Sequence, residues 1–206
     1  MRRLVLLASA LVAALVTGGC SFTPPRDGAA APPSEFTFVA PGGKTRLTYD
    51  PPETRGTVRG LAGEDLADAS RRLALDDFAG RVVVLNIWGS WCGPCRDEVP
   101  DLQEVYRSTR DDGVTVLGVA VRDDRDAARD FLRSRDVEYP SILDPPARSL
   151  AALRGFPPNV VPSTLVLDRG HRVAAVFLGT VRISELLPVV ERIAAEPAPV
   201  AAGGQR

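Results

Sequence analysis

Apolar runs mark two buried strands in the middle of the chain. Val82 to Trp88 is apolar on both faces except at Asn86, and Val114 to Val121 is a second continuous run. Segments of this kind are typical of central strands that helices cover on each side. A shorter strand is expected at Ser141 to Leu143. Together these segments predict the centre of a sheet.

A β-hairpin is predicted further along the chain. Ser163 to Leu167 and Arg172 to Leu178 are strand-like and flank the turn sequence Asp168 to His171. We interpret His171 as a solvated turn residue and expect no chemistry from it.

Helical spacing of apolar residues separates and follows these strands. The expected helices cover Pro94 to about Arg110, about Arg125 to Arg135, Arg148 to Leu153, and Ile183 to Ala194. Pro100 predicts a kink in the first helix. Pro188 is compatible with the last helix if Ser184 caps it and the proline falls in the first turn. The charged cluster Arg122 to Asp130 is interpreted as the solvated start and outer face of the second helix.

The order of strand, helix, strand, helix, hairpin and helix predicts an α/β three-layer fold. Before it, Phe36 to Val39 and Thr45 to Tyr49 alternate around Pro41 to Lys44, which predicts a further hairpin. Asp50 to Ala69 is turn-rich and is expected to be an irregular connection. The expected organisation is a leader at 1–19, a flexible tether at 20–35, the hairpin and connection at 36–69, the α/β domain at 70–195 and a disordered tail at 196–206.

The N-terminus has the layout of an export signal. Arg2 and Arg3 precede the apolar stretch Leu4 to Val16, which is shorter than the ~20 residues of a membrane span. The segment Val16 to Cys20 resembles a bacterial lipobox, so residues 1–19 are predicted to be a signal peptide and Cys20 a lipidated N-terminus carrying a diacylglyceryl group. The alternative is an uncleaved anchor with a free Cys20. Both place the protein at the extracytoplasmic face of a bacterial membrane.

The net charge and the number of cysteines narrow the possible functions. The chain has 206 residues and a formal net charge of −1, which gives no indication of nucleic-acid binding. It has three cysteines. If Cys20 carries lipid, Cys92 and Cys95 are the remaining pair.

The chemistry centres on Trp91 to Cys95, which reads WCGPC. A cysteine at a helix start is next to unpaired backbone N–H groups that stabilise its thiolate, and we expect Cys92 to take that position. Pro94 suits the first turn, and Gly93 allows a tight entry. Cys95 is then shielded but within disulfide reach. Cys92 is predicted to attack a substrate disulfide, and Cys95 to resolve the mixed disulfide.

Two alternatives are weaker. A structural disulfide across two intervening residues closes a very small loop and removes little unfolded-state entropy. A closed structural zinc site needs four ligands, whereas the chain offers one CxxC and the single histidine His171. We therefore predict a redox-active disulfide and no metal.

The string from Asn86 to Pro100, NIWGSWCGPCRDEVP, resembles the thioredoxin superfamily and, within it, the membrane-tethered TlpA/ResA/CcmG-like disulfide oxidoreductases. The resemblance covers about Leu73 to Ala195 and is greatest to actinobacterial ResA-type lipoproteins. It implies a thioredoxin-like fold, a central mixed sheet flanked by helices. The segment Arg125 to Leu153 would be the helical insertion of that branch, and Phe36 to Tyr49 an N-terminal hairpin extension.

The resemblance also implies roles for residues near the dithiol. Val161-Pro162 matches the cis-proline motif, with Pro162 beside Cys92 and its backbone open to a substrate peptide. Substrate contacts are expected from Trp91, Gly93, Pro94, Val161 and Pro162.

Glu98, one helical turn after Cys95, is expected to tune the acid–base behaviour of the thiols. Asn86 stands where cytoplasmic-type thioredoxins carry a buried aspartate, so Glu98 is the nearest candidate to replace it. The alternative for Glu98 is a carboxylate that only complements the helix N-terminus. Trp88 is interpreted as core.

The function implied is a membrane-anchored thiol–disulfide reductase acting on CxxCH disulfides of apocytochrome c or other exported proteins, during cytochrome c maturation. A CcdA/DsbD-type membrane reductant would regenerate its dithiol. One alternative is an oxidant that forms disulfides in exported proteins, since the reduction potential sets the direction. A second alternative is a non-catalytic lipoprotein chaperone or binding module.

Overall fold

The computed structural model describes residues 34–198. The predicted signal peptide, the lipidation of Cys20 and nearly all of the predicted tether lie outside these residues. Among the described residues, no helix is long and apolar enough to cross a membrane.

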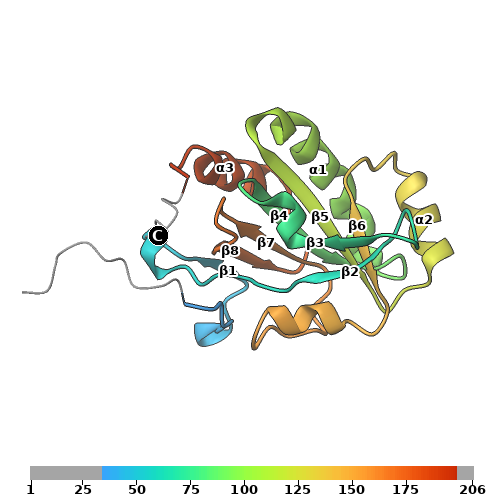
Figure 1. The fold of residues 1–206 in the computed structure, drawn as a ribbon, viewed down its shortest axis with the longest axis horizontal. Helices are drawn as coiled ribbons and strands as arrows, with labels where there is room; N and C mark the ends of the chain where they lie inside the picture. The colour runs from blue at the N-terminus through green and yellow to red at the C-terminus, as the bar shows by residue number, and fades with distance from the viewer. Residues whose placement is uncertain (1–33, 199–206) are drawn as a thin grey trace, which may run out of the picture. The chain divides into compact units, whose positions relative to one another are not determined.

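An eight-stranded mixed sheet organises the described part of the chain, in the order β1-β8-β7-β4-β5-β6-β2-β3 (Figure 1). The strands are β1 (Arg46–Thr48), β2 (Ala62–Asp65), β3 (Arg72–Ala74), β4 (Val82–Trp88), β5 (Val114–Val121), β6 (Ser141–Asp144), β7 (Ser163–Leu167) and β8 (Val173–Leu178). The α-helices are α1 (Gly93–Thr109), α2 (Arg125–Arg133) and α3 (Ile183–Ala194). Short 3-10 helices are η1 (Pro41–Gly43), η2 (Pro52–Thr54), η3 (Leu75–Phe78), η4 (Arg110–Asp112) and η5 (Arg148–Ala152).

The centre of the sheet confirms the predicted α/β fold. Strands β4, β5 and β6 are parallel, and α1 and α2 connect them. The hairpin of β7 and β8 adds to β4 in the antiparallel direction. Every residue of β4 and β5 is buried, as expected of strands covered on both faces.

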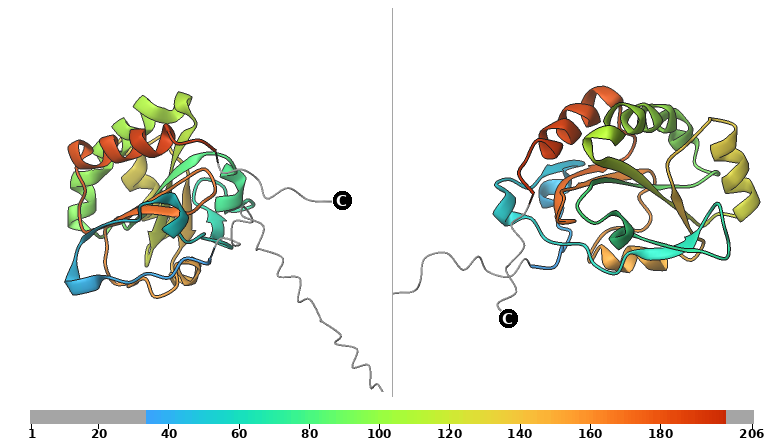
Figure 2. Two further views of the ribbon diagram at one scale, coloured as in Figure 1. Left: turned by 90° about the vertical axis from the view of Figure 1, so that its left-hand side faces the viewer. Right: turned by 45° about the horizontal axis from the view of Figure 1, so that its top comes forward.

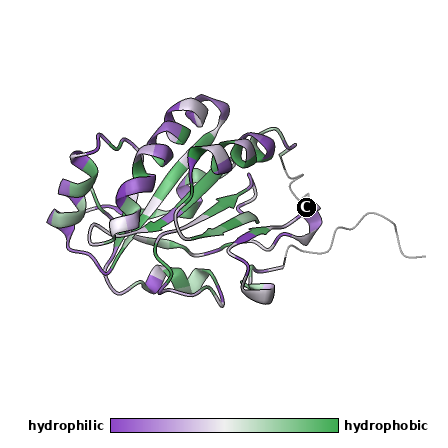
Figure 3. Ribbon diagram, turned by 180° about the vertical axis from the view of Figure 1, so that it is seen from behind, coloured by the Kyte–Doolittle hydropathy of each residue, from purple (hydrophilic) through white to green (hydrophobic). Residues whose placement is uncertain are grey.

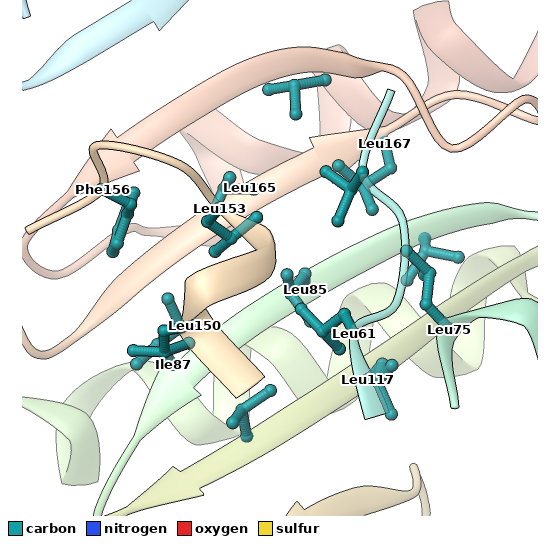
Figure 4. Packing of buried hydrophobic residues seen from close by; sticks show 14 of the residues in the cluster. Leu61, Leu75, Leu85, Ile87, Leu117, Leu150, Leu153, Phe156, Leu165 and Leu167 are labelled. Atoms are coloured by element: carbon teal, nitrogen blue, oxygen red, sulfur yellow. The ribbon is translucent and has the colours of Figure 1, made fainter. Parts of the chain in front are cut away.

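The three α-helices lie over one face of this sheet, and the 3-10 helix η5 lies over the other. Side chains on one face of the central strands, here the helix face, pack with apolar residues of α1, α2 and α3. Figure 2 shows α1 and α3 side by side over that face. The opposite face, here the apolar face, is covered by η5 and by the chain before β4. Figure 4 shows Leu150 of η5, and Leu153 directly after η5, packed with Ile87 of β4 and Leu165 of β7.

The predicted N-terminal hairpin is wrong. Strand β1 pairs with β8, with Arg46 opposite Phe177. Residues near Phe36 instead form isolated bridges, Glu35 with Thr57 and Thr37 with Arg154. Alternation predicts a half-buried strand but does not say which edge it joins. Here β1 covers the backbone groups that β8 would otherwise leave unpaired.

The predicted irregular connection is also wrong in part. It contains β2, which pairs with β6 on one side and β3 on the other. The sequence of β2, AGED, lacks apolar alternation. Its strand conformation follows from the free edge of β6, which local sequence does not reveal.

Two predictions for the C-terminal segment are wrong. Helix α3 begins at Ile183 with Arg182 as its N-cap, so Ser184 does not cap it and Pro188 lies beyond the first turn. The predicted tail is ordered at its start: the Glu196 carboxylate binds Arg55 Nη1 at 2.5 Å and Nη2 at 2.8 Å. The buried Arg55 guanidinium needs anionic partners, and Glu196 supplies one.

Hydropathy follows these layers. In Figure 3 the central strands are hydrophobic, while the helices are hydrophilic over much of their surface. The WCGPC segment, Trp91 to Cys95, lies where β4 ends and α1 begins.

Candidate active site

The dithiol lies at the N-terminus of α1. Cys92 is the N-cap residue, and its Sγ accepts the backbone N–H of Cys95 at 3.2 Å. The Cys92 N–H donates to the Gly89 carbonyl at 3.0 Å, which closes the turn that follows β4. Pro94 falls in the first turn, where a missing N–H has no cost. The local sequence therefore aims free helix N–H groups at the sulfur of Cys92.

Cys92 and Cys95 form a disulfide, with their Cα atoms 5.3 Å apart. Cys92 is 3% exposed and Cys95 is fully buried. Trp91, Gly93 and Pro94 are exposed around Cys92. Of the two cysteines, Cys92 is thus the residue with contact to solvent.

Asp123 orders the turn before Cys92. Its carboxylate accepts the Ser90 N–H at 2.5 Å and the Ser90 hydroxyl at 2.6 Å. Asp123 is buried, so the prediction that Arg122 to Asp130 is a solvated cluster is wrong at this position. Local sequence carries no signal for this contact, because Ser90 and Asp123 lie on different β-to-α connections.

Trp91 is 49% exposed. Its indole N–H donates to the Val121 carbonyl at 3.0 Å, and the Arg122 guanidinium lies 4.9 Å from its ring centroid. These contacts hold an aromatic surface beside the dithiol without burying it.

The Val161–Pro162 peptide bond is cis, the geometry that the resemblance implied. Pro162 directly precedes β7, and its carbonyl accepts the Gly179 N–H at 2.9 Å. Val161 packs against the apolar cluster that contains Cys92 and Cys95. The fold thus brings this segment and the dithiol together from distant parts of the sequence.

Glu98 is fully buried on α1, one turn after Cys95. Its Oε1 accepts the Asn86 Nδ2–H at 2.8 Å, and its Oε2 accepts the Val181 N–H at 3.2 Å. Asn86 Nδ2 also donates to Thr164 Oγ1 at 3.1 Å. The sequence indicated Asn86 and Glu98 but not Thr164 or Val181, whose proximity depends on the β7–β8 hairpin and the entry to α3.

Burial raises the pKa of Glu98 to about 7, from an ordinary value of 4.5. The hydrogen bonds from Asn86 and Val181 act in the opposite direction because they stabilise the carboxylate. A group with a pKa near 7 can both accept and release a proton under physiological conditions.

His171 differs from the prediction. It is 8% exposed, and its Nε2 lies 3.1 Å from the Phe78 carbonyl oxygen. It is therefore a buried residue of the β7–β8 turn and not a solvated one. Within residues 34–198 no cluster of histidine, cysteine and acidic side chains could hold a metal ion.

Comparison with known proteins agrees with the fold. The Redoxin family matches residues 39–190. The thiol-disulfide oxidoreductase ResA of Bacillus subtilis (strain 168) is 33% identical over 110 residues, which are 53% of this chain and 60% of ResA. The match thus spans less than two thirds of that relative.

Two solved structures are similar over nearly their whole length. A secreted thiol-disulfide isomerase from Corynebacterium glutamicum is 42% identical with a TM-score of 0.76, and covers 78% of this chain and 98% of its own. A DsbF homologue from Corynebacterium diphtheriae is 45% identical with a TM-score of 0.73, and the match covers 77% of this chain and 99% of the homologue. The predicted thioredoxin-like fold and the ResA-like resemblance are confirmed. This chain belongs to the Redoxin family, within the thioredoxin superfamily.

Proposed function

We propose that this chain is a thiol–disulfide oxidoreductase with Cys92 as its nucleophile and Cys95 as its resolving thiol. The observation that carries the proposal is the placement of the pair at the start of α1, with the Cys95 N–H directed at Cys92 Sγ. Both this N–H and the positive end of the helix dipole stabilise a thiolate at Cys92. Its slight exposure makes Cys92 the sulfur that a substrate meets first.

Exchange then proceeds by two displacements. The Cys92 thiolate attacks one sulfur of a substrate disulfide, and the other substrate sulfur leaves as a thiolate. The Cys95 thiol gives its proton to the Glu98 carboxylate, and Cys95 Sγ attacks Cys92 Sγ. The second substrate sulfur leaves, so the substrate gains two electrons and the enzyme retains the Cys92–Cys95 disulfide.

Substrate peptides would bind beside the dithiol. Among residues 34–198, nothing forms a hydrogen bond with the N–H or C=O of Val161, which therefore remain open to an extended peptide. The exposed Trp91, Gly93 and Pro94 would form the other side of the contact. This arrangement suits recognition by backbone pairing, which tolerates many sequences.

We also propose that the protein works at the extracytoplasmic face of the membrane, held there by lipid on Cys20. The signal-like segment Met1 to Gly19 and the lipobox-like Val16 to Cys20 support this. Its substrates would be exported proteins with disulfides, apocytochrome c among them, and a CcdA/DsbD-type membrane protein would re-reduce it. A tether would raise its effective concentration near such partners.

Reduction of insulin by chemically reduced protein tests the chemistry. The wild type should precipitate insulin, and Cys92→Ser should not. Equal and substantial activity of the two proteins would refute Cys92 as the nucleophile, whereas no activity above background in either protein would leave a binding module. Cys95→Ser should accumulate mixed disulfides on Cys92 in cells, and their identity by mass spectrometry tests the proposed substrates.

A second candidate is the reverse reaction, the formation or rearrangement of disulfides. It is favoured by the comparison with the secreted isomerase, which is more similar to this chain than ResA is. Titration of the Cys92–Cys95 couple against glutathione separates the two directions, with ~30 mV for each tenfold change in equilibrium. A potential near that of thioredoxin supports the reductase, and a potential near that of DsbA supports the oxidant.

A further inference from the structure

Four residues on the adjacent strands β7, β4, β5 and β6 form a row across the sheet beneath α1. Asn86 on β4 lies opposite Thr164 on β7 and Gly118 on β5, and Gly118 lies opposite Ser141 on β6. Asn86 contacts Glu98 of α1, which places the row on the helix face. Trp88, two residues after Asn86 on β4, points to the same face and stacks on Phe131 of α2.

Three polar atoms of this region lack a hydrogen-bond partner among the protein atoms of residues 34–198. They are Asn86 Oδ1, Trp88 Nε1 and Ser141 Oγ. All three residues are almost or fully buried. Buried polar atoms without a protein partner are commonly bonded to internal water, because leaving them unpaired is costly.

Gly118 lets two of these atoms converge. A Cβ at this position would lie 2.2 Å from Ser141 Oγ and 2.7 Å from Trp88 Nε1. The hydroxyl and the indole N–H therefore both lie over the Cα of Gly118. Asn86 lies between Thr164 and Gly118, and its Nδ2 is engaged by Thr164 and Glu98, which leaves Oδ1 of the same amide for the Gly118 side.

The three atoms have complementary chemistry. The indole N–H is only a donor, the amide oxygen only an acceptor, and the serine hydroxyl can be either. One water can accept from Trp88, donate to Asn86 and bond to Ser141. This gives it the three hydrogen bonds that buried waters typically make.

We propose that a water molecule bound over Gly118 by Trp88 Nε1, Ser141 Oγ and Asn86 Oδ1 holds the Asn86 amide with its Nδ2–H directed at Glu98. Thr164 cannot impose this orientation alone, because its hydroxyl can accept from Nδ2 or donate to Oδ1. Trp88, Gly118 and Ser141 are thus positioning residues. Each acts on Glu98 through the orientation of Asn86.

The consequence is a bias in the protonation of Glu98. A donating Nδ2–H stabilises the carboxylate, whereas a flipped amide would present Oδ1 and stabilise the carboxylic acid. Other titratable groups face Glu98 from their own elements: Cys95 and Asp101 on α1, Tyr139 before β6, and Arg46 on β1. The proposed water acts on the orientation of the Asn86 amide and does not change the charge of any of these groups.

The role of this site rests on the proposed function of Glu98, but its test does not require activity. We would follow the Glu98 carboxyl signal by NMR through a pH titration of the oxidised protein. Ser141→Ala and Trp88→Phe should each raise the midpoint by about one pH unit, a tenfold change in the protonation constant. Trp88→Phe keeps an aromatic ring against Phe131 and removes the donor together with part of the buried ring volume, so the Ser141 variants carry the comparison for hydrogen bonding.

Two controls separate hydrogen bonding from packing. Ser141→Thr retains the hydroxyl and should return the midpoint toward the wild-type value. Thr115→Ala removes a buried hydroxyl of β5 whose side chain lies on the apolar face, and should leave the midpoint unchanged. In the wild type, the Trp88 indole proton should show a cross-peak to slowly exchanging water.

Three results would overturn the inference. They are an unchanged midpoint in folded Ser141→Ala and Trp88→Phe, an equal shift in Ser141→Thr, and an indole proton without water contact. Failure of the proposed function would look different, because the wild type would then fail to reduce insulin while the Glu98 midpoint still moved in these variants.

Discussion

The two faces of the central sheet come from the same strands but differ in kind. Alternate residues of β4 and β5 face η5 and the chain before β4, and there they form a continuous apolar cluster. On the helix face two apolar clusters, one toward α3 and one around the dithiol, are separated by the row of Thr164, Asn86, Gly118 and Ser141. Glu98 is buried against this row. Both faces bury apolar side chains, but only the helix face also buries a row of polar groups, for which the proposed chemistry at Cys92 and Cys95 supplies a reason.

The largest effect is expected at the dithiol itself. Cys92→Ser should lower the rate of thiol–disulfide exchange by about a thousandfold or more, because a serine hydroxyl does not replace the thiolate. Stopped-flow reduction of a peptide disulfide measures this. A residual rate within tenfold of the wild type would mean that Cys95 alone carries the reaction.

A core substitution on the apolar face should act on stability only. Leu117→Ala removes a fully buried side chain of β5 and should lower the free energy of unfolding by about 2–5 kcal/mol. Urea unfolding gives this number. The exchange rate of the folded variant should stay within about twofold of the wild-type rate. A large loss of rate would show that the apolar face also affects the chemistry.

Glu98 should make stability depend on pH. Its pKa is raised to about 7 in the folded protein from 4.5, so the protonated form favours folding. The stabilisation is fully present below pH 4.5 and is lost as the pH rises through about 7, a difference of up to about 3 kcal/mol. Glu98→Gln should abolish this dependence and slow exchange.

The matched control is Glu104→Gln, an exposed glutamate of the same helix. It should retain the wild-type pH dependence in urea unfolding. If both variants behave alike, the dependence arises elsewhere in the protein.

The smallest effect is expected at Arg122, which lies beside the exposed Trp91. Arg122→Ala removes the guanidinium over the Trp91 ring and should cost about 0.5–1 kcal/mol of stability. Its effect on exchange should be less than threefold with a neutral peptide. Thermal unfolding and the same kinetic assay measure both, and a tenfold loss of rate would extend the active site to Arg122.

The sequence was informative where a signal is local. Val82 to Trp88 and Val114 to Val121 are strands at the predicted bounds because a buried strand needs a continuous apolar run. The helix start at Cys92 follows from Gly93 and Pro94 for a similar reason.

Contacts between distant segments were not predictable from local pattern. The edge that β1 joins, the strand β2 and the bond from Asp123 to Ser90 depend on which elements meet in the folded sheet. The cis peptide bond before Pro162 was implied only by the family resemblance, and the geometry agrees. Trp88 is core, as predicted, but its indole N–H belongs to the polar region near Glu98.

The central claim is that the helix face buries a carboxyl group ready for proton transfer beside the dithiol. Titration of the Glu98 side-chain carboxyl by NMR, assigned by its absence in Glu98→Gln, tests this most directly. We expect a midpoint of about 7 in the oxidised protein. A midpoint near 4.5, as for an exposed glutamate, would contradict it.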